Sequence, residues 1–240
     1  MADQRLRALE RQAAQGDQAA HARWLLARLR AGELSASRLH VAAALGHEPA
    51  REALTNRAPA QLGGLNAWEE DMQDWAPDLL VAAALAAGRL GLAAWEERHA
   101  DDRRLREALE AAEAWAAQRG GAAAVQAAIR SLAEMEGVLA ADWAVYDPPG
   151  DLVEDANAEL PVEVAYDEAA AAPERSARAG GRAVKEAVRC VAWRAQAASR
   201  SSLSNYAWKA GWELRWALGA EEAEAALRDA LVAWAVGVPA

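Results

Sequence analysis

Residues 90–119 read LGLAAWEERHADDRRLREALEAAEAWAAQR, and this segment indicates the fold class more clearly than any other. After two good N-cap residues, Asp101 and Asp102, apolar side chains recur at helical spacing, so one face is apolar and the opposite face is charged. The apolar positions are Leu105, Ala108, Leu109, Ala112, Trp115 and Ala116. We predict an amphipathic helix here, preceded by another helix that carries Trp95, with both packed into a helical domain.

The composition favours the same fold class. Hydrophobic residues make up 53% of the chain, but alanine supplies much of that share, and the strand-favouring residues Ile and Thr are nearly absent. Phe is missing while Trp occurs 11 times, so indoles must provide most of the aromatic packing volume. We therefore predict an all-α protein, a multi-helix bundle of antiparallel helical hairpins.

Glycines and prolines divide the predicted helices into two domains. Residues 1–58 read as four short helices with glycine between them, which is typical of a small N-terminal module of two hairpins, similar to a helical repeat. The sequence TNRAPAQLGGLN at 55–66 breaks the helical pattern and predicts a linker. Residues 66–240 then form the predicted main bundle. Its last three helices are expected at about 174–199, with an interruption considered at Gly180-Gly181, and at 203–218 and 221–236.

One segment of the main bundle differs in composition. From 142 to 172 there are nine acidic residues and no basic residue, and three prolines and a glycine interrupt any long element. We expect a long acidic loop or insertion at about 142–173. The plainer interpretation is a solvated acidic linker, and the alternative is a docking or protease-sensitive segment that presents carboxylates to a basic partner. The candidate contact residues are Asp151, Glu154, Asp155, Glu159, Glu163, Asp167 and Glu168.

The charge distribution bears on the class of partner. The net charge is −10, but residues 61–175 carry −16 while the segments before and after them carry +3 each. An acidic middle repels phosphates, so we predict no nucleic-acid partner. We find no signal peptide and no uncharged apolar run of membrane-spanning length, and we expect a cytoplasmic protein without a membrane partner. The single cysteine, Cys190, excludes an internal disulfide and is best interpreted as a small buried hydrophobe.

Three tryptophans form the sharpest local pattern. Trp208, Trp212 and Trp216 follow one another every four residues, on the face opposite an apolar face that includes Leu203, Ala207, Ala210 and Leu214. The favoured interpretation is a helix buried on all sides. The alternatives are a partner-binding face and, less favoured, an indole-lined cage for a small molecule. Trp193, which lies among Arg182, Glu186 and Arg189, is the better candidate for an exposed aromatic residue.

No catalytic or metal-binding motif is recognisable in the sequence. The four histidines, His21, His40, His47 and His99, have neither the spacing nor the carboxylate partners of a ligand set, so we interpret them as structural or solvent-facing. Phosphate-binding, dinucleotide-binding and nucleophile-elbow motifs are missing as well. We therefore predict no catalytic residues, no cofactor and no metal.

Three segments resemble a known family. VAAALAAGRLGLAAWEERHADDRRLREALEAAEAWA (81–116), RSARAGGRAVKEAVRCVAW (175–193) and YAWKAG (206–211) are similar, in the same order, to segments of the all-helical immunity proteins of bacterial polymorphic-toxin systems. The resemblance covers about residues 66–236 and implies a helical fold and a protein that binds another protein. The family's helices typically contain histidines where this chain has Ala, Arg or Gln, so no ligand role is implied for those positions. Residues 1–54 resemble a helical module at the N-termini of multidomain proteins from myxobacteria-like genomes.

These observations lead to three hypotheses. The first is a non-catalytic regulator or immunity-like inhibitor in a bacterial conflict or defence system, whose partner is a toxin, a protease or another defence protein. Its predicted contact residues are Trp193, Arg189, the tryptophans at 208, 212 and 216, and the acidic loop. The second is an adaptor or protease substrate that is docked or cleaved at 142–173. The third is an enzyme or small-molecule binder with an indole-lined pocket. The sequence does not predict an oligomeric state.

Overall fold

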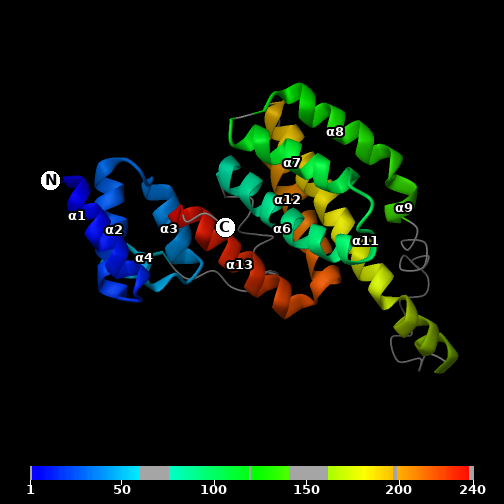
Figure 1. Cartoon of the computed structure of the whole chain (residues 1–240), viewed down its shortest axis with the longest axis horizontal. Coiled ribbons are helices and arrows are strands. Elements are labelled where there is room, and N and C mark those ends of the chain that lie inside the picture. Colours follow the sequence, from blue (N-terminus) through cyan, green and yellow to red (C-terminus); the bar gives the residue numbers. More distant parts are fainter. Residues whose placement is uncertain (1, 60–75, 119, 141–161, 197–198, 238–240) are drawn as a thin grey trace. The chain divides into compact units, whose positions relative to one another are not determined.

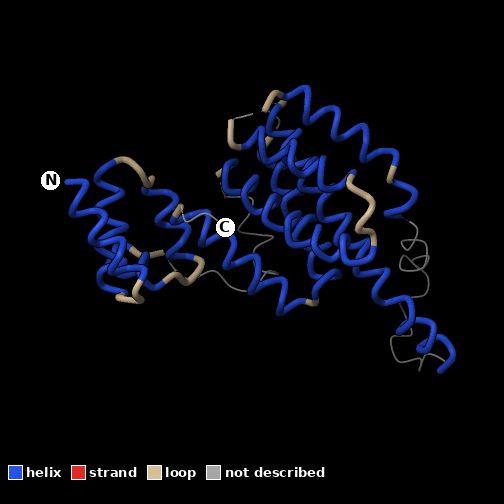
Figure 2. Tube along the Cα trace, in the orientation of Figure 1, coloured by secondary structure: helices blue, strands red, loops and turns tan. Residues whose placement is uncertain are grey.

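A computed structural model describes most of the chain, and every regular element in the described part is a helix (Figures 1 and 2). The described ranges are residues 2–59, 76–118, 120–140, 162–196 and 199–237. The predicted all-α fold class is therefore confirmed. The chain divides into two compact units: Met1–Trp68 together with Arg228–Ala240, and Glu69–Leu227.

The first unit begins with the two predicted helical hairpins. Its elements are α1 (Ala2–Ala14), α2 (Gln18–Ala31), α3 (Ala36–Ala44), α4 (Glu48–Leu54) and a short 3₁₀ turn, η1 (Thr55–Arg57). The local signals act as the sequence suggests. The Ala20 N–H donates to the side chain of the N-cap Asp17 at 2.9 Å, and the Arg38 N–H donates to the hydroxyl of the N-cap Ser35 at 3.3 Å. Gly32 ends α2 with a left-handed backbone.

The first unit also contains the end of the last helix, α13 (Ala220–Val236), from Arg228 onward. Ala235 and Val236 are buried in the same apolar cluster as Leu25 and Leu39. The sequence assigns these residues to the main segment 66–240. Helical periodicity shows which side of a helix is apolar, but it does not show which other helix that side will contact.

The second unit is organised around one long helix. Its elements are α6 (Pro77–Arg98), α7 (Arg104–Ala116), α8 (Ala122–Glu134), α9 (Glu136–Ala140), α11 (Val162–Ala195), α12 (Arg200–Leu218) and the first part of α13. Helix α11 packs against α6, α12, α7, α8 and α9 (Figure 1). The apolar face predicted for α7 is buried, including Leu105, Leu109 and Ala112.

Several predicted helix boundaries need correction. Helix α6 runs without a break through Trp95 to Arg98. Helix α7 begins at Arg104, and Asp102 accepts a hydrogen bond from the backbone N–H of that residue at 3.2 Å. Helix α12 begins at Arg200, before the predicted start at 203, and Ser199 caps it. Short polar residues stand close together at these positions, so composition alone does not select the capping residue.

The predicted acidic loop 142–173 is wrong over its last twelve residues. Helix α11 begins at Val162 and continues through Pro173 and through Gly180-Gly181, without the interruption considered there. The Glu- and Ala-rich composition of 163–172 favours helix, and this propensity outweighs the helix-breaking tendency of Pro173. Residues 142–161 of the predicted loop and most of the predicted linker 55–66 lie outside the described residues.

Helix α6 is long and apolar enough, by length and composition, to cross a membrane. In the structure, 72% of its most apolar stretch is buried inside the protein. Its apolar character therefore matches its place in the core, where residues 79–88 are all buried.

Two glycines allow α6 and α11 to approach closely. A Cβ atom added at Gly91 would lie 2.6 Å from the carbonyl oxygen of Gly180 and 2.9 Å from the Cβ atom of Ala183. The first of these neighbours is backbone, which cannot move aside as a flexible side chain can. The interface between α6 and α11 therefore requires a residue without a side chain at Gly91.

We expect Gly91→Ala to destabilise the protein by about 3 kcal/mol, because the added methyl group would push two helix backbones apart. Urea unfolding measures the loss. The matched control is Gly137→Ala in α9, where an added Cβ atom meets nothing within 4 Å and stability should be unchanged or slightly raised. Equal stability of the Gly91→Ala variant and the unmodified chain would contradict this account of the interface.

Candidate functional site

The candidate site lies on the hairpin of α11 and α12. One face of α12 packs Leu203, Ala207 and Leu214 into the core, as predicted. On the opposite face, Trp212 is 39% exposed, Trp216 is 57% exposed and Trp208 is half-buried. The favoured interpretation of a helix buried on all sides is therefore wrong. A helix with two opposite apolar faces can have its second face either buried or exposed. The sequence contains nothing that identifies an element covering this side of α12.

The three tryptophans of α12 are here called the aromatic face, and two of them, Trp208 and Trp212, contact each other. The rings of Trp208 and Trp212 stack with centroids 5.6 Å apart at an interplanar angle of 28°. The guanidinium of Arg215 lies 5.3 Å from the Trp212 ring centroid. Such contacts reduce the number of rotamers that a surface indole samples. The aromatic face therefore presents partly ordered rings to solvent.

Trp193 of α11 has an aromatic contact of its own. It is 39% exposed, in agreement with its predicted exposure, and it stacks on Tyr206 of α12 with centroids 6.1 Å apart. The charged residues that precede it on α11 are less exposed than the sequence suggests. Glu186 is buried, and Arg182 and Arg189 are half-buried.

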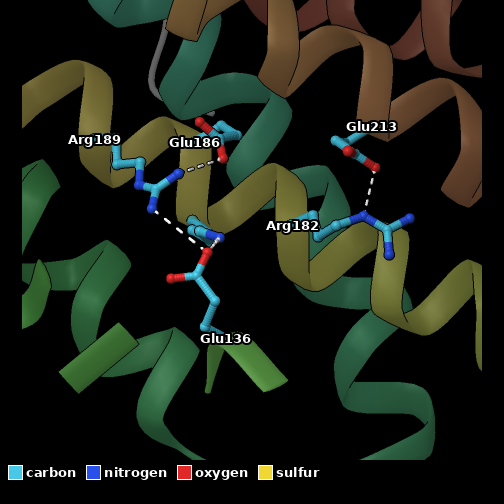
Figure 3. A network of polar contacts seen from close by, with 6 residues as sticks. Glu136, Arg182, Glu186, Arg189 and Glu213 are labelled. Carbon is cyan, nitrogen blue, oxygen red and sulfur yellow. Dashed lines mark hydrogen bonds and ion pairs between the residues drawn. The ribbon is translucent and has the colours of Figure 1, made fainter. Parts of the chain in front are cut away.

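These charged side chains form ion pairs that connect three helices (Figure 3). The Nε atom of Arg182 donates to Glu213 of α12 at 2.8 Å, and its Nη1 atom donates to the carbonyl oxygen of Leu139 in α9 at 2.9 Å. Arg182 therefore bridges two neighbours of α11. The side chain of Glu213 is buried, so this pair is shielded from solvent.

The second part of the network centres on Glu136 of α9. Lys185 donates to this carboxylate, and Arg189 lies 3.7 Å from it. Arg189 also donates to Glu186 at 3.1 Å, while the other carboxylate oxygen of Glu186 is buried without a hydrogen-bond partner (Figure 3). The sequence places Arg182, Glu186 and Arg189 near Trp193 but does not reveal that Arg182 pairs with Glu213 of α12 and Arg189 with Glu136 of α9. Their helical spacing, 182, 185, 186 and 189, is the signal that could have identified them as one stripe.

The environment shifts two carboxyl pKa values in opposite directions. Burial raises the pKa of Glu213, and the Arg182 guanidinium partly offsets this effect. The hydrogen bond from Lys185 lowers the pKa of Glu136, with burial opposing it. A buried carboxyl with a raised pKa is common at catalytic sites. The charge of the Glu213 carboxylate is balanced by Arg182, so a structural role accounts for the observed contacts.

Three of the histidines and the cysteine are held in structural contacts, while His40 is exposed. His21 and His47 touch edge to face with centroids 5.1 Å apart, and burial lowers the pKa of His47 to about 4. His99 stacks on Trp95 and lies 3.2 Å from Glu174. Burial raises the pKa of Cys190 to about 12, so its thiol stays protonated, as expected of a buried hydrophobe. Within the described ranges, no three His, Cys, Asp or Glu residues are placed to hold a metal ion.

The acidic residues predicted as contacts fall outside what the structure describes, either entirely or in their side chains. Asp151, Glu154, Asp155 and Glu159 lie outside the described residues. Glu163, Asp167 and Glu168 lie on the first turns of α11, and their side chains are also outside the described part. The candidate site is therefore the aromatic face together with Trp193 and the ion pairs beneath them.

Comparison with known proteins adds no assignment: no protein-family model, no curated protein and no solved structure matches this sequence. The resemblance to the immunity proteins of polymorphic-toxin systems therefore stays a prediction.

Removing Arg182 should leave the buried Glu213 carboxylate without its nearest cation. We expect Arg182→Ala to cost about 3 kcal/mol near pH 7. Because burial already raises the pKa of Glu213, the folded variant should bind a proton more readily than the unfolded chain. The loss should therefore shrink as the pH falls toward about 5. Urea unfolding at both pH values measures this change.

The control is Arg182→Ala combined with Glu213→Gln, in which a neutral amide replaces the carboxylate. The pH dependence that the single substitution introduces should disappear in this double variant. An equal loss of stability for Arg182→Ala at both pH values would show that the pair does not act through charge.

His47 should make the first unit sensitive to acid. Its pKa is lowered to about 4 in the folded chain against an ordinary value of 6.5, so the unfolded chain binds the proton first as the pH falls. Stability of the first unit should be complete above about pH 6.5 and should decrease by up to about 3 kcal/mol toward pH 4. Amide hydrogen exchange in α2 and α4 measures this loss.

His47→Gln should flatten the pH profile of amide exchange, and the same substitution at the exposed His40 should not. If both variants retain the full decrease in stability between about pH 6.5 and 4, His47 is not its source.

Proposed function

We propose that this protein is a non-catalytic, protein-binding regulator that contacts its partner through the aromatic face of α12 and through Trp193. The observation that supports this proposal best is the exposure of Trp212 and Trp216, at 39% and 57%, on a helix whose other face is fully packed. Tryptophan and arginine are the residues that most often dominate the energy of protein interfaces.

The arrangement of the rings favours a macromolecular partner. Stacking of Trp208 on Trp212, and the Arg215 guanidinium beside Trp212, restrict the rings before any partner arrives. Pre-ordered side chains lose less conformational entropy on binding. Exposed Lys209 lies on the same helix and adds positive charge. A matching partner would present an apolar surface with acidic residues at its rim.

The buried ion pairs support the same proposal indirectly. Arg182, Lys185 and Arg189 each contact a carboxylate from α9, α11 or α12. These contacts hold α11 in register with α12, and thus hold Trp193 against Tyr206. The network gives the surface tryptophans a rigid base, which a binding face requires.

A role as an immunity-like inhibitor in a bacterial defence system is the narrower form of the proposal. It depends on the order of the three segments that resemble such proteins. The alternative is an adaptor or protease substrate that acts through residues 142–173. Residues 162–173 belong to helix α11, and no observation on the described residues favours this role.

The test uses the proteins encoded beside this one in its genome, each titrated against the purified chain by calorimetry. We expect one of them to bind, and the double substitution Trp212→Ala with Trp216→Ala to weaken binding at least about 30-fold, the effect of losing one or more strong interface contacts. The control is Val138→Ala, which trims an apolar residue on α9 that is 44% exposed and should leave affinity unchanged. The proposal fails if none of these proteins binds, or if affinity survives the loss of both indoles.

A further inference from the structure

The C-terminal turn of α13 is held by two arginines of the first unit. Arg28 of α2 donates to the carbonyl oxygen of Val236, and Arg38 of α3 donates to the carbonyl oxygen of Trp234. These contacts join residues 208 and 196 positions apart in the sequence. A third arginine acts in the opposite direction, since Arg228 of α13 donates to the carbonyl oxygen of Leu45 at 3.2 Å.

The acceptors of Arg28 and Arg38 are carbonyls of the last helical turn, and the Trp234 carbonyl also accepts from the Gly237 N–H at 3.2 Å. The last four carbonyls of a helix have no partner within the helix and form the negative end of its dipole. Placing two guanidiniums close together is unfavourable in itself: burial and the charge of Arg28 both lower the pKa of Arg38. The carbonyls of Trp234 and Val236 compensate for this repulsion, so the arginine pair suits the end of a helix.

The side chains of the turn are recognised as well as its backbone. The Arg38 guanidinium lies 4.4 Å from the Trp234 ring centroid, while Ala235 and Val236 are buried in the apolar cluster of α2, α3 and α4. Arg28 is oriented by Trp24, whose ring centroid is 4.7 Å from its guanidinium, and by Glu33 at 3.6 Å.

Gly237 completes the recognised sequence. Its φ of +73° is in the left-handed region, and a Cβ atom there would lie 3.0 Å from Nη2 of Arg28. Both the conformation and the space therefore favour glycine directly after the helix. The contacts specify a helix that ends in Trp-Ala-Val-Gly.

We propose that α2, α3 and α4 form a receptor for the C-terminal turn of an α-helix, and that residues 228–237 of a second copy of this chain can occupy it in place of the chain's own. The identical segment is seated there in the structure, and every contact that holds it is non-covalent. The chain's own segment has the advantage of a high effective concentration, so an added copy competes well only when that segment is weakened.

The experiment titrates a fluorescent peptide of residues 220–237 into the full chain. The unmodified chain should bind it weakly. The chain with Trp234→Ala should bind it at least about tenfold more tightly, because its own segment is a poorer competitor. Adding Arg38→Ala to that variant should abolish binding, and a peptide with Gly237→Ala should not bind. A purely structural role for Trp234 would not produce this gain, and equal binding by the unmodified chain and the Trp234→Ala chain would overturn the proposal.

A chain that ends at Leu227 provides the second readout. If it unfolds or loosens, the peptide should restore the amide-exchange protection of α2 and α3. If it stays folded, it should bind the peptide more tightly than the full chain does. Failure of the peptide to restore protection, or to bind the folded truncated chain, would overturn the proposal.

Discussion

The close approach of α6 and α11 at Gly91 and Gly180 is the constraint on which the second unit depends. An added Cβ atom at Gly91 would meet backbone at 2.6 Å, so these helices are separated by little more than their main chains. Alanine and glycine make such packing available, because they add little volume between two helices. The cost is a core with few large side chains, and Trp95 and several leucines provide the remaining volume. Cys190 and the glycines of α11 that contact α6 are buried because α11 lies at the centre of the second unit.

That position has an electrostatic consequence. A helix packed against neighbours on most sides cannot send all of its charged residues to solvent, so Arg182, Lys185 and Glu186 are paired where they are. Pairs of this kind contribute little net stability compared with apolar residues of the same size, but breaking one leaves an uncompensated charge. They therefore act chiefly to fix the register of α11 against α9 and α12. Each of these two helices contributes one carboxylate, Glu136 from α9 and Glu213 from α12.

The all-α class, most helix positions and the apolar faces were predictable, because helical periodicity and capping residues are local properties of the sequence. Asp17 and Ser35 cap their helices, as short polar side chains at these positions favour. What could not be predicted was the partner of each helix face. Trp212 and Trp216 of α12 are exposed because no described element covers them, Arg182 of α11 pairs with Glu213 of α12, and the end of α13 packs on α2 and α3. These three facts concern contacts between distant segments, which periodicity does not encode.

Tryptophan and arginine meet in both units, but their environments differ in a way that separates their roles. In the first unit, Arg38 covers the ring of Trp234 while its N–H groups are used by a helix end, so ring and cation already have a partner. In the second unit, Arg215 lies beside Trp212, whose ring is 39% exposed. The same pair of residue types thus forms a partly buried contact beside the core of the first unit and part of a solvent-exposed surface in the second. Because indoles are the main aromatic material of this chain, the distinction between core and binding surface rests on what covers each ring and not on residue type.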